Sequence, residues 1–211
     1  MQENMVWHPE VLAEDAQKTL VTLSQLPAVQ PFYLAGGTGL ALQRGHRTSI
    51  DLDLFSSDLV SEDLLLSMLQ GIKGITVVFK SPETLHIHFS STKVSFLGYH
   101  YSVLFPFSLY NGIKVADPRD IAAMKLTAIA SRGTKRDFVD LYVLSQQYGL
   151  DEVLRLFEQK FSQAAFNDIH LMKSLTYFAD ADRDAMPHML QPITWDQVKQ
   201  FFTTHVPRLK R

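Results

Sequence analysis

The chain has 211 residues, of which 46% are hydrophobic and 20% are charged, so it can bury the core of one large domain or two small ones. Twenty basic and 22 acidic side chains give a formal charge of -2, which excludes a global field that attracts nucleic acid or a membrane. Cysteine is absent, which excludes disulfides and thiolate metal sites. The start of the chain lacks a signal-peptide pattern, and no run approaches about 18 apolar residues. We therefore expect a cytoplasmic protein with no membrane partner.

The first half of the chain alternates between helical and extended patterns. Apolar spacing predicts a helix from about His8 to Leu26. "PFYLAGG" predicts a short buried strand that ends in glycines, residues 38–44 predict a helix, and "SIDLDLF" alternates with the period of a strand. Ser61 is the expected N-cap of the next helix, which stops near Gly71. The β-rich stretches that follow cover residues 74–81, 83–90, 93–105 and 112–117.

From Asp117 onward every pattern is helical. The predicted helices cover residues 119–131, 135–148, 150–161, 166–179 and 194–205, the last with Thr194 as N-cap. This order predicts an α+β fold, in which a mixed β-sheet with packed helices is followed by a C-terminal helical bundle. The predicted domains are residues 1–116 and 117–211.

Two aspartates stand one residue apart in the predicted strand of "SIDLDLF". Side chains alternate along a strand, so Asp51 and Asp53 share one face while Ile50, Leu52 and Leu54 point to the core. Two like charges on one face are unfavourable unless solvent or a cation neutralises them. Carboxylate pairs that leave room for phosphate oxygens and water suit Mg²⁺. The pattern therefore fits either a metal site or a solvated strand face.

A glycine-rich turn precedes the aspartates. Gly36 and Gly37 follow a predicted strand and open a helix, where glycine lets the backbone approach a phosphate and the helix N-terminus donates amides to it. The hydroxyl of Thr38 adds a side-chain donor. Glycine is also common in such turns for steric reasons alone. The order of strand, glycine turn and Asp-x-Asp strand is more specific, and it predicts a phosphate cradle beside a metal pair.

Two blocks of the sequence, "YLAGGTGLALQRGHRTSIDLDLFS" and "MKLTAIASRGTKRDFVDLYVL", resemble the AbiEii/AbiGii toxin-type nucleotidyltransferases of the DNA polymerase β-like superfamily. The resemblance covers roughly residues 30–148. It implies a nucleotidyltransferase-like mixed sheet, a glycine turn, an Asp-x-Asp metal pair, and a helical half that supplies a lysine and a second acidic motif. It also implies the toxin role of a toxin-antitoxin or phage-defence system, with a cognate antitoxin as partner.

In the helical half, Lys125 lies within an apolar stripe that includes Ile121, Met124 and Ile129. Either its stem packs while the ammonium reaches water, or the ammonium contacts a triphosphate, as the resemblance implies.

Asp137 and Asp140 follow the expected N-cap Thr134 on one side of the next helix. They either complement the helix dipole and pair with Lys135 or Arg136, or one of them activates or orients an acceptor hydroxyl. We favour Asp137 for that role.

Some positions depart from the superfamily pattern or leave two interpretations open. Ser95 occupies the strand position at which polymerase β-like enzymes commonly carry a third carboxylate. His86 and His88 share one strand face, but no clear third metal ligand accompanies them. They are either exposed strand residues or part of a nucleic-acid cleft. Arg47 leads into the aspartates, either in a solvated loop or as a phosphate contact.

These patterns predict a nucleotidyltransferase that uses an NTP and Mg²⁺ or Mn²⁺. Asp51 and Asp53 are the expected metal ligands. The expected nucleotide-binding residues are Gly36, Gly37, Thr38, Arg47 and Lys125. The expected catalytic residues are Asp51, Asp53, Lys125, Asp137 and Asp140. The resemblance implies RNA as the acceptor, in particular a tRNA 3′ end, and protein hydroxyls are the next acceptor to consider. The alternative is a module of the same fold that binds nucleotide or a partner with weak or no turnover, which Ser95 favours.

Overall fold

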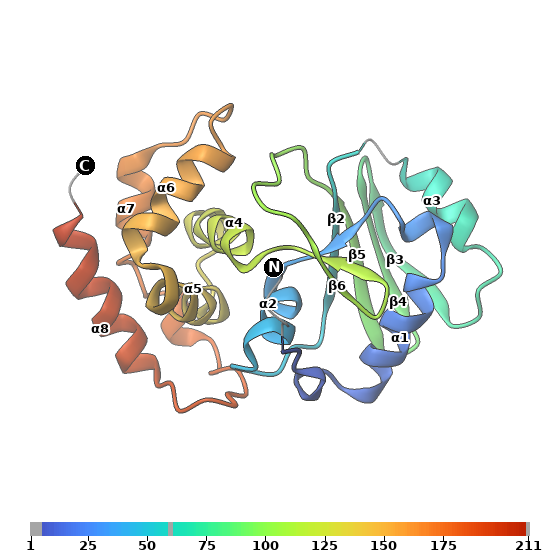
Figure 1. Ribbon diagram of the computed structural model, residues 1–211, viewed down its shortest axis with the longest axis horizontal. Helices are drawn as coiled ribbons and strands as arrows, with labels where there is room; N and C mark the ends of the chain where they lie inside the picture. The colour runs from blue at the N-terminus through green and yellow to red at the C-terminus, as the bar shows by residue number, and fades with distance from the viewer. Residues whose placement is uncertain (1–5, 59–60, 210–211) are drawn as a thin grey trace. The chain divides into compact units, whose positions relative to one another are not determined.

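The computed structural model describes residues 6–58 and 61–209. These residues form two compact units (Figure 1). The first unit contains the chain up to Ser102 together with Pro106–Asp117, and the second contains Val103–Phe105 together with the chain from Pro118 onward.

The first unit is built on a seven-stranded mixed sheet with the strand order β3-β4-β5-β2-β1-β7-β6. Its strands are β1 (Tyr33–Leu34), β2 (Leu52–Ser56), β3 (Ile75–Ser81), β4 (Thr84–Phe89), β5 (Thr92–Gly98), β6 (Ser108–Tyr110) and β7 (Ile113–Val115). The β2–β5 and β1–β7 pairs are parallel, and the other pairs are antiparallel. The predicted mixed sheet is confirmed. β6 has no counterpart in the sequence-based prediction.

Three helices accompany this sheet: α1 (Glu14–Ser24), α2 (Gly36–Arg44) and α3 (Glu62–Leu69). Ser61 caps α3 as predicted, since its side chain accepts a hydrogen bond from the Leu64 amide. α1 and α3 bury leucines in one core cluster with the strands. That cluster includes Leu20, Leu23, Leu65, Leu69, Leu54, Ile87 and Phe96. The opposite face of the central strands is therefore the one left for polar side chains.

The helix predicted from His8 is interrupted before α1. A 3₁₀ turn spans Pro9–Val11, and α1 begins only at Glu14. Between them, the Val11 carbonyl accepts a hydrogen bond of 2.9 Å from the Ser49 amide, and Leu12 forms a bridge with Ser49. This pairing keeps the chain extended there and holds the loop that leads into β2.

The second unit is helical: α4 (Pro118–Ser131), α5 (Lys135–Tyr148), α6 (Leu150–Lys160), α7 (Asp168–Ser174) and α8 (Trp195–His205). Thr194 and Gln197 form a capping box at the start of α8, which confirms the predicted N-cap. α7 is shorter than the predicted 166–179. α7 ends at Ser174, and beyond it the Phe178 ring packs against Phe138 and Trp195, with centroid distances of 5.2 and 5.8 Å.

A buried ion pair draws a segment from the first part of the sequence into this unit. Asp120 accepts hydrogen bonds from the amides of Leu104 and Phe105, and Lys160 donates to it at 2.7 Å. Both charged side chains are almost fully buried. Residues 103–105, which sequence pattern assigns to a β-rich stretch, are held here because they satisfy the remaining acceptor sites of a buried carboxylate.

Candidate nucleotide site and buried ion cluster

The glycine turn has the predicted form, and its backbone conformation requires glycine. α2 begins at Gly36, one residue after the end of β1, and Gly36 has a φ of +61°, in the left-handed region. The Ala35 amide donates to the Asp53 carbonyl at 3.1 Å, which fixes the turn to β2. A methyl group on Gly36 would lie 3.1 Å from Oδ2 of Asp53. The Asp53 carboxylate therefore packs directly against the start of α2.

Gly37 is packed on its other side by an arginine. A methyl group on Gly37 would lie 2.4 Å from Nη2 of Arg47, closer than the two atoms can come. Arg47 is only 3% exposed and donates to the Thr48 carbonyl at 2.9 Å, and its neighbour His46 is fully buried. The interpretation of this segment as a solvated loop is therefore wrong. A guanidinium beside a helix N-terminus suits a phosphate ligand.

Thr38 connects the same helix to the aspartates. Its buried hydroxyl donates to the Asp51 carbonyl and lies 2.7 Å from Oγ of Ser49. The hydroxyl thus holds the segment before β2 against α2. A direct contact between Thr38 and a phosphate stays a prediction, because it requires that hydrogen bond to be exchanged.

The two aspartates alternate with buried leucines. Asp53 is in β2 and Asp51 directly precedes it, and both are partly exposed, whereas Leu52 and Leu54 are fully buried. Ile50, which we expected in the core, is 66% exposed, because the strand begins only at Leu52. Within residues 6–58 and 61–209, no group of three or more His, Asp or Glu side chains is arranged to hold a metal ion. Two carboxylates are still a sufficient protein contribution for Mg²⁺, which usually keeps several waters and takes phosphate oxygens.

Ser95 lies beside Asp53. In the parallel β2–β5 pair Asp53 is the register partner of Ser95, and in the antiparallel β4–β5 pair Ser95 is the partner of His86. Register partners on adjacent strands point to the same face. Ser95 therefore neighbours the aspartate pair, and it carries a hydroxyl where a carboxylate would supply a third acidic ligand.

In the second unit, Lys125 is buried between two carboxylates. Its Nζ lies 3.0 Å from Oδ1 of Asp137 and 2.6 Å from Oδ2 of Asp140, and all three side chains are at most 6% exposed. The interpretation in which the ammonium of Lys125 reaches water is therefore wrong. Its predicted contact with a triphosphate, and the catalytic role of Asp140, stay predictions.

Asp137 accepts four hydrogen bonds. Lys125 and Nη2 of Arg132 donate to Oδ1, while Nε of Arg132 and the Thr134 hydroxyl donate to Oδ2. Burial alone would raise the pKa of Asp137, but the charge of Lys125 and the bonds from Arg132 and Thr134 outweigh it and hold that pKa well below its usual range. A carboxylate so stabilised is a poor proton acceptor. The geometry favours a role in holding Lys125 over one as a base, while the role of Asp137 in orienting the acceptor hydroxyl stays a prediction.

The alternative in which Asp137 pairs with Lys135 is also wrong. Nζ of Lys135 donates instead to the Asp184 carbonyl, and the Lys135 amide donates to the Asp184 carboxylate, which caps α5. Thr134 occupies the N-cap position as predicted, but its hydroxyl bonds to the Asp137 side chain. Arg132 was not singled out from the sequence. The signal available was its position before Gly133, whose φ of +52° turns the chain back toward the start of α5.

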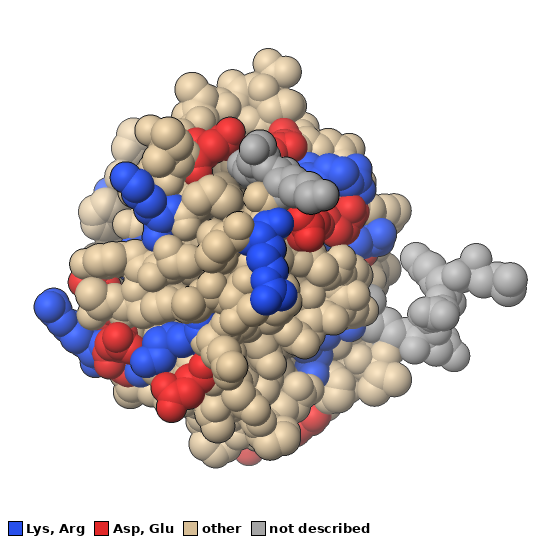
Figure 2. Space-filling model, turned by 90° about the vertical axis from the view of Figure 1, so that its left-hand side faces the viewer, with Lys and Arg blue, Asp and Glu red and all other residues tan. Residues whose placement is uncertain are grey.

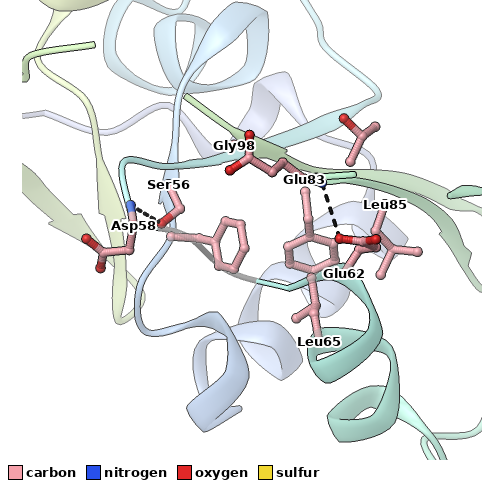
Figure 3. A pocket seen from close by; sticks show the side chains of 10 residues that line it. Ser56, Asp58, Glu62, Leu65, Glu83, Leu85 and Gly98 are labelled. Atoms are coloured by element: carbon pink, nitrogen blue, oxygen red, sulfur yellow. Dashed lines mark hydrogen bonds between the residues drawn. The ribbon is translucent and has the colours of Figure 1, made fainter. Parts of the chain in front are cut away.

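A small cavity lies where β2 and β5 end (Figure 3). Asp58, Glu62 and Glu83 line it, with the Asp58 amide bonded to Ser56 Oγ and the Glu83 amide bonded to the Glu62 carboxylate. Its volume of about 10 Å³ accommodates roughly one water molecule. This cavity is therefore too small to bind a nucleotide.

The charges on the surface are mixed where they can be seen. Figure 2 shows the face on the left of Figure 1, where Lys and Arg side chains are interspersed with Asp and Glu among uncharged residues. Such a face has a balanced field, as expected from the formal charge of -2. Among residues 6–58 and 61–209, none of the helices is long and apolar enough to cross a bilayer.

Comparison with known proteins identifies the family. A family model described as nucleotidyl transferase AbiEii toxin, Type IV TA system, matches residues 18–208. An uncharacterized protein of Aquifex aeolicus (strain VF5) is 34% identical over 201 residues, which cover 92% of this chain and 96% of that protein.

Solved structures share the fold. MenT4, a nucleotidyltransferase toxin of Mycobacterium tuberculosis H37Rv, aligns with a TM-score of 0.58 at 16% identity over 92% of this chain and 84% of its own. JHP933 from Helicobacter pylori aligns with a TM-score of 0.54 at 18% identity over 93% of this chain and 92% of its own. The predicted nucleotidyltransferase-like fold is confirmed, and the chain belongs to the AbiEii family of nucleotidyltransferase toxins.

Proposed function

We propose that the protein transfers a nucleotide from an NTP to a hydroxyl of an RNA acceptor, in particular a tRNA 3′ end, in a reaction that depends on Mg²⁺ or Mn²⁺. The observation that carries the proposal is the packing of the Gly36-Gly37 helix start between the Asp53 carboxylate and the Arg47 guanidinium. Helix amides, a cation and a carboxylate thus lie together at the start of α2, and groups of these kinds bind a triphosphate with its metal in other enzymes.

The donor set fits a hard divalent cation. Asp51 and Asp53 supply carboxylate oxygens, and the open positions suit water and phosphate oxygens. When bound, the cation would neutralise negative charge on the phosphates.

The residues of the first unit orient the substrate. The start of α2 and Arg47 would bind the phosphate oxygens, and Thr38 would keep Asp51 close to α2. The acceptor oxygen would attack the α-phosphorus while the bond to the β-phosphate oxygen breaks, so pyrophosphate leaves and the hydroxyl proton passes to solvent or a nearby base. Fixed donors and fixed orientation supply most of the rate enhancement in such reactions.

Binding and transfer are measured separately. Isothermal titration with each NTP in the presence of Mg²⁺ should show saturable binding by the wild-type protein, and EDTA should abolish it. Incubation with a labelled NTP and total RNA should label an RNA species, and purified tRNA should compete with it. The absence of both NTP binding and labelling would contradict the proposal.

A second candidate is a protein of the same fold that binds a nucleotide or a partner without turnover. The hydroxyl of Ser95 beside Asp53 favours it, since a hydroxyl is a weak substitute for a carboxylate ligand. Tight NTP binding without labelling of RNA or protein would support this candidate over the enzyme.

The toxin role is a further part of the proposal, and it rests on the family description. Expression of the chain alone should slow bacterial growth, and a neighbouring gene for an antitoxin should restore it. Growth unaffected by expression of a protein that labels RNA in vitro would contradict the toxin role while leaving the enzyme intact.

A further inference from the structure

The sheet face that carries Asp53 continues across three further strands to Phe79. The register partner of Asp53 is Ser95, that of Ser95 is His86, and that of His86 is Phe79. All four side chains therefore lie in one row on the same face. At about 4.8 Å per strand, the row extends about 14 Å from Asp53 to the edge strand β3.

Phe79 offers an exposed ring at the end of this row. It is 51% exposed, and its ring centroid lies 5.7 Å from that of His86 at an interplanar angle of 32°. The two rings are tilted relative to each other and lie in contact, and we call them the aromatic pair. An exposed aromatic ring beside a second ring offers a surface on which a planar ligand such as a base can stack.

His86 adds an unsatisfied polar atom. Its Nδ1 is buried and has no hydrogen-bond partner among the described residues. Such an atom is costly unless a ligand or water completes its bonding. Lys93 is exposed in the neighbouring row of the same face, where its register partner is His88, and it brings a positive charge close to the aromatic pair.

The order of strands separates this surface from the glycine turn. The turn follows β1, which neighbours β2 on one side, whereas β5, β4 and β3 follow β2 on the other side. If the phosphates of an NTP lie at Gly36 and Gly37, the part of the sheet face that carries Ser95, His86 and Phe79 remains available for a second substrate.

From this arrangement we infer that the aromatic pair binds a base near the end of a single-stranded RNA acceptor, and this inference rests on the proposed function. The base stacks on Phe79, Nδ1 of His86 bonds to an edge of the base or to the ribose, and Lys93 contacts the backbone phosphate. The row then directs the end of the strand toward Asp53. Stacking accepts any base, so this surface supplies affinity with little sequence preference.

The test compares Phe79→Ala with Phe79→Tyr, which keeps the ring, and with Val78→Ala, an equally exposed neighbour on β3. We expect Phe79→Ala to raise the KM for the RNA acceptor about tenfold and to leave the KM for the NTP unchanged, because one stacked base is lost. Phe79→Tyr and Val78→Ala should behave like the wild type. His86→Phe should raise the acceptor KM by a smaller factor.

A binding experiment without NTP separates this inference from the proposed function. Fluorescence anisotropy with a short labelled single-stranded RNA should show the same tenfold loss for Phe79→Ala. If the wild type labels no RNA but Phe79→Ala weakens binding of the oligonucleotide, the proposed function is contradicted and the inference about the aromatic pair is supported. If the wild type labels RNA while Phe79→Ala keeps the acceptor KM, or raises only the KM for the NTP, the inference is overturned.

Discussion

Asp137→Asn tests whether the buried ion cluster stabilises the helical unit. The substitution keeps the shape of the side chain and removes its charge, so of the two carboxylates beside Lys125 only Asp140 remains. Asparagine keeps a single oxygen acceptor, so Lys125 and Thr134 can no longer both donate to this side chain. Removing one charge of a buried ion pair costs about 3–5 kcal/mol, and the remaining oxygen together with Asp140 places the expected loss at the lower end of that range. The Arg132 side chain is 64% exposed, so its ion pair contributes less than about 1 kcal/mol.

These contributions predict that Asp137→Asn lowers the free energy of unfolding by about 3 kcal/mol, a large part of the 5–15 kcal/mol typical of a domain. Urea unfolding followed by circular dichroism near neutral pH measures it. Arg132→Met is the matched control, since it removes the exposed partner of the same carboxylate, and it should cost less than about 1 kcal/mol. A loss below about 1 kcal/mol for Asp137→Asn, or equal losses for both variants, would refute the reasoning.

The same pair predicts a pH dependence. The folded-state pKa of Asp137 is lowered, so its stabilising effect is fully present above the unfolded-state value near 4 and declines as the pH falls toward the folded-state pKa. The difference in unfolding free energy between the wild type and Asp137→Asn should stay constant from about pH 7 to pH 5 and shrink below about pH 4. A difference that grows in acid would contradict this sign.

Two other substitutions probe the rest of the structure. Lys160→Met leaves the Asp120 carboxylate buried without its cation and should lower the free energy of unfolding by about 3 kcal/mol in urea titrations. Lys173→Met, at an exposed lysine, is the control and should cost less than about 0.5 kcal/mol. Similar costs for the two variants would contradict a stabilising role of the buried ion pair. Gly36→Ala and Gly71→Ala both place alanine at positive φ, so each should lower the free energy of unfolding by about 1–2 kcal/mol. Only Gly36→Ala should weaken NTP binding in isothermal titration, because a methyl group there meets Asp53 whereas open space surrounds Gly71. Equal NTP affinity in both variants would exclude a phosphate site at the turn.

Short-range sequence patterns predicted much of the fold. The alternation of Asp51 and Asp53 with Leu52 and Leu54 is visible in the sequence, because a strand with one buried face repeats every two residues. The capping box at Thr194 was equally visible, since its partners are three residues apart. The mixed sheet and the helical half followed from the same short-range periods.

Features that depend on distant partners could not be predicted. Lys125 pairs with Asp137 and Asp140 only because α4 and α5 pack together after the turn at Gly133, and helical spacing within α4 says nothing about that neighbour. The burial of Arg47 likewise depends on a loop that Ser49 pins to Val11. Sequence spacing placed the candidate residues on their elements, while their contacts were decided by tertiary packing.

Transfer of a labelled nucleotide by Asp53→Asn tests the central claim most directly. Asp63→Asn, on the exposed surface of α3, is the matched control, and thermal unfolding shows whether each variant remains folded. The account predicts that in Mg²⁺ the wild type and Asp63→Asn label RNA, whereas Asp53→Asn is slower by about 100-fold or more while still folded. A folded Asp53→Asn variant that labels RNA at the wild-type rate, or labelling that persists in EDTA, would contradict the account.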